Sequence, residues 1–204
     1  MTTSRRSKRD DWLDAGLAIL AGQGAPALTI ERLTERLGLS KGSFYHHFGG
    51  MGGYKTALLA HIEDVCTTRL IDLAEQDTGA APMAKLERLM DLVVSDVGHG
   101  PELEVAVRAW AQQDPEARAL QERVDHARID YLRTLWLALS DDPDEAGQVA
   151  SLFYLITIGG AHVIPPVPGP ELRGLFEFSM RLAGGGRTRS QRSSDDPRQQ
   201  DPAH

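Results

Sequence analysis

The sequence predicts an all-α protein of about nine helices, with an N-terminal three-helix domain that contains a helix-turn-helix and a C-terminal helical domain. Apolar residues recur at helical spacing over most of the 204 residues, and no segment keeps the alternation of a strand for long. Glycine and proline clusters interrupt this pattern where helices should end. The expected helices span residues 10–22, 29–37, 40–47, 53–76, 82–97, 101–113, 115–139, 143–163 and 170–183.

The segment TIERLTERLGLSKGSFYHHF, from Thr29 to Phe48, predicts two short helices joined by a tight turn. Thr29 can cap the first helix, Gly38 allows it to end, and Ser40 can cap the second. Phe44 and Phe48 are four residues apart, so both rings should point to the same side of the second helix. We expect these two rings to hold the second helix against the core.

The opposite face of the second helix is expected to be polar. Short hydroxyl and imidazole groups, together with a lysine, suit the major groove of DNA, where they can meet base edges and phosphates. A plain helical hairpin with a solvated face is the alternative, but the caps, the glycine and the aromatic pair favour a helix-turn-helix. We expect base contacts from Ser43 and His46, close backbone approach at Gly42, and phosphate contacts from Thr29, Ser40, Lys41 and Tyr45.

Residues from Asp11 to about His61 resemble the DNA-binding domain of the tetracycline-repressor (TetR-like) family of bacterial transcription regulators. The resemblance rests on the helix-turn-helix, on the amphipathic helix around Trp12 before it, and on KTALLAHI after it. It implies a phosphate contact for Lys55, the lysine that opens the next helix. Here the segment GGMGGY separates Phe48 from Lys55, so its glycines could instead approach a phosphate or form a hinge.

The charge of the chain is divided unevenly, although the total is −7. Residues 1–55 contain eight basic and five acidic side chains, which leaves +3 there and −10 on the remainder. A basic head on an acidic body is typical of a protein that binds DNA through one domain. The basic N-terminal arm can add contacts to the DNA backbone or the minor groove.

The helix expected at 143–163 is apolar nearly all round between 149 and 158. Such a helix needs a second apolar surface, which is either its own core or another copy of the chain. TetR-like proteins pair their last two long helices in an intersubunit four-helix bundle, so the resemblance implies a homodimer. The body can also hold a small-molecule effector in an apolar cavity with a few polar groups. The candidate lining residues are Trp110, Phe153, Tyr154, Thr157 and His162.

Signals for other classes of function are weak. The seven histidines lack the spacing of metal ligands, no nucleotide-binding or nucleophile motif occurs, and the single Cys66 has no disulfide partner. We therefore expect no metal, no cofactor and no catalysis. The N-terminus has no apolar signal segment, and the apolar part of 148–170 is too short to cross a membrane, so we expect a cytoplasmic protein.

Together these observations predict a DNA-binding domain at 1–55, a regulatory and dimerisation domain at 56–184, and a disordered tail at 185–204 that lacks apolar residues. The predicted function is sequence-specific binding of double-stranded DNA by a transcriptional regulator. In its simplest form this is a repressor that an apolar or amphipathic effector releases from a near-palindromic operator. The alternative is a helical small-molecule or lipid-binding protein, or an enzyme, without DNA binding.

Overall fold

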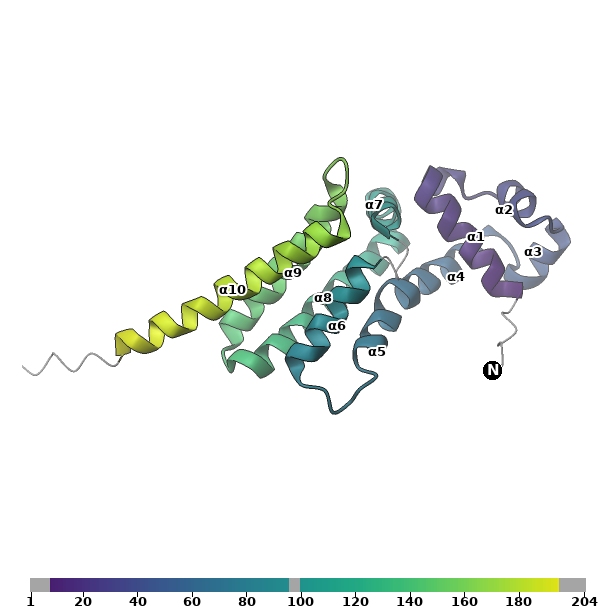
Figure 1. Cartoon of the computed structure of the whole chain (residues 1–204). Coiled ribbons are helices and arrows are strands. Elements are labelled where there is room, and N and C mark those ends of the chain that lie inside the picture. Colours follow the sequence, from purple (N-terminus) through teal and green to yellow (C-terminus); the bar gives the residue numbers. More distant parts are fainter. Residues whose placement is uncertain (1–7, 96–99, 195–204) are drawn as a thin grey trace, which may run out of the picture.

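A computed structural model describes residues 8–95 and 100–194, which form helices without a strand (Figure 1). The first helices are α1 (Lys8–Gln23), α2 (Ile30–Leu37) and α3 (Lys41–Phe48), with a 3-10 turn η1 (Ala25–Ala27) after α1. A continuous helix follows, made of α4 (Met51–Glu63), the π-helical η2 (Asp64–Thr68) and α5 (Arg69–Ala74). The remaining helices are α6 (Pro82–Val94), α7 (Gly100–Ala111), α8 (Pro115–Ser140), α9 (Pro143–His162) and α10 (Gly169–Ser194).

The all-α prediction is confirmed: with α4, η2 and α5 counted as one, the described residues contain nine helices close to the predicted places. The exception is α10, which continues to Ser194 and so includes residues 185–194 of the tail that was predicted to be disordered. No proline occurs between residue 185 and Pro197, so helical backbone hydrogen bonds can continue along this segment. Three predicted segments lie outside the described residues, at 1–7, 96–97 and 195–204.

The head of the molecule consists of α1, α2, α3 and the start of α4, gathered at one end (Figure 1). Its core contains large side chains that are almost fully buried, among them Trp12, Leu33, Phe44 and Tyr54. The Tyr54 hydroxyl donates a hydrogen bond to the Trp12 carbonyl oxygen at 2.9 Å, which ties α4 to α1. Gly16 makes this approach possible, because a Cβ atom there would lie 2.0 Å from the Tyr54 hydroxyl.

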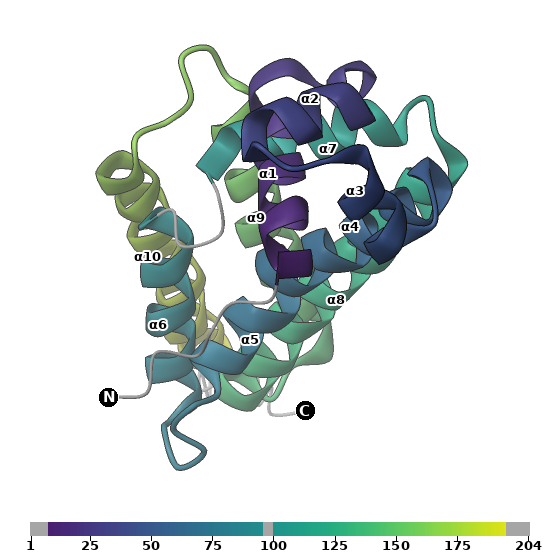
Figure 2. The same cartoon turned by 90° about the vertical axis from the view of Figure 1, so that its right-hand side faces the viewer.

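The body of the molecule consists of α5 to α10. Its core forms around Leu86, Trp136, Phe153 and Phe176, contributed by α6, α8, α9 and α10. Helices α8 and α9 have the most extensive contact in the body, and α10 packs on α6 and α9 (Figures 1 and 2). Helix α9 carries the uncharged apolar stretch, but neither it nor any other helix within 8–95 and 100–194 could span a membrane.

Two elements join the head to the body. The first is the continuous helix that starts as α4 in the head and becomes η2 and α5 in the body, so the predicted boundary between 55 and 56 falls inside α4. The second is α7, which lies between α1 and α9 (Figure 1). Leu103 and Val107 of α7 pack into the core of the head, together with Leu120 of α8.

Candidate nucleic-acid interface and ligand cavity

Both predicted caps of the helix-turn-helix are present. The Thr29 hydroxyl oxygen accepts a hydrogen bond from the backbone N–H of Arg32 at 3.3 Å, at the start of α2. The Ser40 hydroxyl oxygen accepts one from the backbone N–H of Ser43 at 3.2 Å, at the start of α3. Between them Gly38 ends α2 with a φ of 65°, in the left-handed region that favours glycine. Each cap uses a lone pair of its hydroxyl, which leaves the O–H free to donate to a phosphate.

Phe44 fixes α3 from behind. Its ring is fully buried and meets the Trp12 ring edge-on at a centroid distance of 5.4 Å. The rings of Phe48 and Tyr54 both lie 5.3 Å from it, so residues of α1, α3 and α4 share one aromatic cluster. Such a cluster is tightly packed and orients the exposed face of α3 relative to the rest of the head.

The outward face of α3 is polar and accessible. Tyr45 is 52 % exposed, and Lys41, Gly42 and His46 are also exposed. Lys41 forms an ion pair with Glu31 of α2, which lies at the surface. At Gly42 an added Cβ atom would meet only the Ser40 hydroxyl, at an ordinary 3.7 Å, so the fold itself does not require glycine at this position.

The glycine-rich turn between α3 and α4 is explained largely by its own geometry. Gly49 and Gly50 have φ values of 68° and 150°, which L side chains rarely adopt. A Cβ atom at Gly53 would lie 2.1 Å from the Phe48 carbonyl oxygen, so a larger residue would push α4 away from α3. Gly52 has neither a positive φ nor a close neighbour, so its geometry does not require glycine. Three of the four glycines are thus needed to start α4 directly behind the end of α3.

Lys55 is directed toward the body. Its ammonium group lies 2.7 Å from the Asp114 carboxylate and 2.9 Å from the Glu116 carboxylate. Hydrogen bonding to Asp114 raises the pKa of Lys55, which stays charged. Asp114 also caps α8, since it accepts hydrogen bonds from the backbone N–H groups of Glu116 and Ala117, both at 3.0 Å. The phosphate contact predicted for Lys55 therefore requires that it leave, or share, this ion pair.

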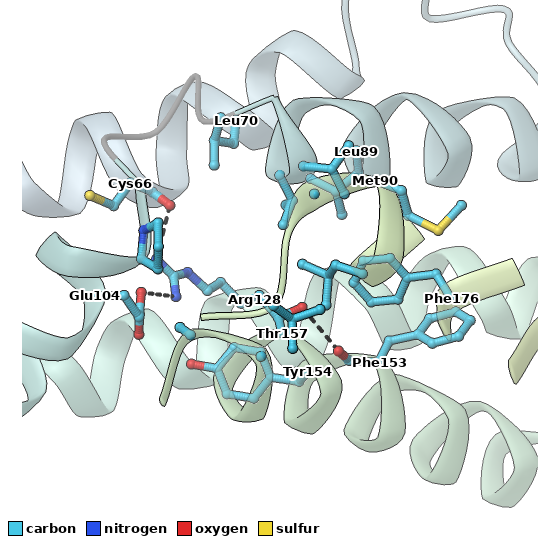
Figure 3. A pocket seen from close by; sticks show the side chains of 18 of the residues that line it. Cys66, Leu70, Leu89, Met90, Glu104, Arg128, Phe153, Tyr154, Thr157 and Phe176 are labelled. Atoms are coloured by element: carbon cyan, nitrogen blue, oxygen red, sulfur yellow. Dashed lines mark hydrogen bonds and ion pairs between the residues drawn. The ribbon is translucent and has the colours of Figure 1, made fainter. Parts of the chain in front are cut away.

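The body contains a cavity of about 450 Å³ enclosed by η2 and helices α5 to α10 (Figure 3). Most of its wall is apolar, whereas Glu104, Arg128 and Tyr154 form a polar end. In Figure 3 these three side chains lie on one side, and Met90 and Phe176 lie on the other. A mainly apolar hollow with a few polar groups at one end is typical of small-molecule sites.

The structure brings together three of the five predicted ligand residues. Phe153, Tyr154 and Thr157 line this cavity, as α9 forms one of its walls. Trp110 does not, because α7 turns it toward the core of the head, against which it packs while partly buried. His162 also lies apart from the cavity, since it ends α9 and lines a second, shallower hollow on the surface.

Arg128 occupies the centre of the polar end. Its Nη1 lies 2.9 Å from a carboxylate oxygen of Glu104. Its Nε donates to the Thr67 hydroxyl at 3.1 Å, and its Nη2 donates to the Cys66 carbonyl oxygen at 3.0 Å. Thr67 and Cys66 belong to η2, and π-helical turns often occur at functional positions. Arg128 therefore connects the cavity to the helix that comes from the head.

A second arginine extends this network. The Arg108 Nε lies 2.7 Å from Glu104, and its Nη2 lies 2.9 Å from Asp125. The Tyr154 hydroxyl accepts a hydrogen bond from Arg108 and donates one to Asp125, both at 2.6 Å. Burial raises the pKa of Tyr154 to about 12, so the hydroxyl keeps its proton. Burial alone would raise the pKa of Glu104, but the two neighbouring guanidinium groups, first that of Arg128, lower it.

The sequence analysis missed Glu104 and Arg128 as cavity residues, and Arg108 as the second arginine of their network. Two local signals were present. Glu104 and Arg108 have the i,i+4 spacing of an ion pair within one helix. Arg128 follows Val124 by four residues and precedes Tyr131 by three, which places it on the inward stripe of α8 rather than on its solvated face. A charged residue on an inward stripe needs a buried partner, and here Glu104 supplies it.

Residues 13–61 match the family of bacterial regulatory proteins described as the tetR family. The matched range begins inside α1 and ends near the end of α4, so it contains both caps, the glycine-rich turn and the Phe44, Phe48 and Tyr54 rings of the aromatic cluster. The match agrees with the resemblance drawn from the helix-turn-helix. No curated protein matches the chain.

Solved structures with the same fold extend the likeness to the body. A transcriptional regulator from Rhodococcus sp. Rha1 is 17% identical, with a TM-score of 0.70 over 88% of this chain and 97% of that one. The regulatory protein TetR from Rhodobacter sphaeroides is 20% identical, with a TM-score of 0.66 over 84% and 96%. A ketosteroid transcriptional regulator of Mycobacterium tuberculosis is 19% identical, with a TM-score of 0.57 over 89% and 95%. These likenesses show a shared fold from head to body.

Proposed function

We propose that the chain is a DNA-binding transcriptional regulator of the TetR family, a homodimeric repressor that a small apolar or amphipathic molecule releases from its operator. The match of residues 13–61 to this family favours DNA binding over the alternative of a carrier or an enzyme without DNA binding. The observation that carries the proposal is the polar face of α3, which the buried Phe44 holds outward at the end of the molecule.

Helix α3 is the recognition helix of this proposal. Its exposed side chains carry hydrogen-bonding groups, which suits contacts to base edges and phosphates in the major groove. The caps at the two helix starts present hydroxyl groups to the backbone, where phosphates accept hydrogen bonds. Ser43 and His46 contact base edges, Gly42 admits close approach, and phosphate contacts come from Thr29, Ser40, Lys41, Tyr45 and Lys55.

The dimer forms through α9 and α10. Leu152 and Leu155 on α9 are exposed, and so are Leu175, Phe178 and Leu182 on α10. Their spacings of three and seven residues place them in one stripe on each helix, and the two helices pack against each other. Exposed apolar surface of this extent marks an interaction site, and pairing with the same stripe of a second copy gives a four-helix bundle. In such a dimer the two recognition helices read half-sites about 34 Å apart, or a multiple of this distance.

The effector acts through the two elements that join the body to the head. Helix α7 carries Leu103 and Val107 on the face toward α1, and Glu104 on the face toward the cavity. The continuous α4–η2–α5 helix carries Cys66 and Thr67 in the cavity wall. An effector that favours a different arrangement of α7 and η2 shifts the population toward heads that are spaced wrongly for DNA.

In this account residues 1–55 bind DNA, while residues from 56 onward regulate and dimerise, with α10 extending this part to Ser194. The protein acts in the cytoplasm, where its operator lies. Its function is tested by filter binding of genomic DNA fragments to the full chain. Selective retention of a few fragments supports the proposal, and a reporter gene placed behind such a fragment falls in expression when the protein is present. Equal retention of all fragments contradicts the proposal.

A further inference from the structure

We propose that the cavity of the body takes an uncharged, mainly apolar molecule that carries a hydrogen-bond acceptor, such as a carbonyl oxygen, at one end, and that Arg128 binds this acceptor. The inference rests on the proposed function, because it names the chemical class of the effector. It follows from three properties of the polar end: its charge, the use of its donors and its place in the cavity.

The charged groups at the polar end cancel one another. Arg108 and Arg128 carry two positive charges, and Glu104 and Asp125 carry two negative charges. Each carboxylate lies within 2.9 Å of a guanidinium group. A ligand with a carboxylate or an ammonium group would lose its hydration here without gaining a counter-ion. Glu102 also lines the cavity, but its side chain is exposed and water screens its charge.

Four hydroxyl groups lie in the wall; that of Thr67 accepts a hydrogen bond from Arg128, and the other three donate their protons within the protein. Tyr154 donates to Asp125 at 2.6 Å, and Thr157 donates to the Phe153 carbonyl oxygen at 3.1 Å. Tyr131 similarly donates to a carboxylate oxygen of Glu75 at 2.8 Å. These hydroxyls therefore have little to offer a ligand that needs a donor.

Arg128 is different, because a guanidinium group has five N–H donors. Within the described part of the chain, three of these have partners, on Thr67, Glu104 and Cys66. The remaining N–H groups can donate to an oxygen of a ligand without breaking the ion pair to Glu104. An acceptor oxygen thus fits the unused capacity of this end of the cavity, and a neutral one keeps its charge balance.

The rest of the cavity favours an apolar ligand. Away from Arg128 the wall consists mainly of aliphatic and aromatic side chains, including Leu86 and Leu172. Leu89, Met90 and Phe176 of this part are seen in Figure 3. A volume of about 450 Å³ is within the range for small-molecule sites. The ligand therefore has one polar end and an apolar remainder.

The test uses three probes with the same ten-carbon chain, which are 2-decanone, decanoate and decylammonium. Each is titrated into the full-length protein by calorimetry in the absence of DNA. We expect 2-decanone to bind at least about tenfold more tightly than either charged probe, because only the charged probes lose hydration without compensation. Tightest binding of decanoate or of decylammonium, or binding of none of the three, overturns the proposal.

A substitution sharpens the test by changing the charge of the polar end. Glu104→Gln removes one carboxylate and leaves an excess positive charge beside Arg128, so decanoate should gain about tenfold or more relative to 2-decanone. Glu122→Gln is the matched control, because it makes the same change at an exposed position of α8 that does not line the cavity. It should leave the order of the probes unchanged. If Glu104→Gln binds the probes in the same order as the unaltered protein, the electrostatic argument is wrong.

The proposal and the proposed function fail in different ways. If the probes bind in another order, the inferred class of ligand is wrong, but the proposal that the head binds DNA still stands. If 2-decanone binds best but operator affinity does not change in its presence, the ligand class stands and the release mechanism falls.

Discussion

The head and the body of this protein differ in how their interiors are packed and in which side chains they expose. In the head, Trp12, Phe44 and Tyr54 are fully buried in one packed aromatic cluster, and the outward side of α3 is polar. In the body, rings such as Phe153 and Phe176 leave a cavity of about 450 Å³ between them, and the outward sides of α9 and α10 are apolar. A filled interior holds a reading surface in one orientation, whereas an unfilled one can adapt to a ligand. The difference indicates which half recognises DNA and which half responds.

The largest effect is expected at the apolar stripe of the body. Leu155 is 65 % exposed in the single chain, and Leu155→Glu would bury a carboxylate twice in a two-fold dimer, at several kcal/mol each. The variant should sediment as a monomer at concentrations where the unaltered protein is a dimer. Ala119→Glu adds the same charge to an exposed position of α8 and should remain dimeric. Equal sedimentation of Leu155→Glu and the unaltered protein would place the dimer interface elsewhere.

The next effect compares the two interiors directly. Phe44→Ala opens a cavity in a filled core and should lower the free energy of unfolding by about 3–5 kcal/mol, measured by urea denaturation. Phe153→Ala enlarges a cavity that already exists, so its cost should lie at the low end of this range or below it. A larger loss for Phe153→Ala than for Phe44→Ala would contradict the contrast between head and body.

Gly42→Ala tests the recognition helix without disturbing the fold. An added methyl group meets only the Ser40 hydroxyl at 3.7 Å, and alanine favours a helix by about 0.5–1 kcal/mol, so thermal stability should be kept or rise. Operator affinity should fall by about 1–3 kcal/mol if the DNA approaches the backbone here. Gly22→Ala on α1 is the control, because its added Cβ atom also has open space and it lies outside the proposed interface. Equal affinities of the two variants would show that DNA does not approach α3 at Gly42.

The smallest effect concerns Lys55. Lys55→Ala should weaken binding to all DNA sequences. The slope of the logarithm of the binding constant against the logarithm of the salt concentration should become less steep by about one unit. Glu116 is the second partner of Lys55, at 2.9 Å, so Glu116→Gln should weaken the attachment of the lysine to the body, although Asp114 remains, and strengthen DNA binding by up to about 1 kcal/mol. This gain should vanish when Lys55 is also replaced by alanine. An unchanged salt slope in Lys55→Ala would mean that the lysine only joins head to body.

The head could be predicted from the sequence because its determinants are local. Thr29 and Ser40 cap helices through backbone groups three residues away, and the spacing of Phe44 and Phe48 shows which side of α3 is buried. The pairing of Lys55 with Asp114 spans 59 positions and depends on how the body meets the head, so no local pattern indicates it.

The cavity could be predicted only in part for the same reason. The apolar stretch of α9 identified Phe153, Tyr154 and Thr157, but the rotation of α7 between head and body decides that Trp110 faces away from the cavity and Glu104 faces into it. The length of α10 shows a further limit. Composition indicates where apolar residues end along the chain, but it does not show where a helix ends. The backbone of α10 stays helical to Ser194, because no proline interrupts it.

The most direct test of the account is the selection of duplexes bound by the purified full chain from a random pool, followed by sequencing. The account requires that two copies of one rigid α3 read the same bases in opposite directions. It predicts an inverted repeat whose half-sites lie about one helical turn apart, or a multiple of this distance. It also predicts that His46→Ala selects sites in which one base position of each half-site is no longer specified. A pool without enrichment, or an enriched site without two-fold symmetry, would contradict it.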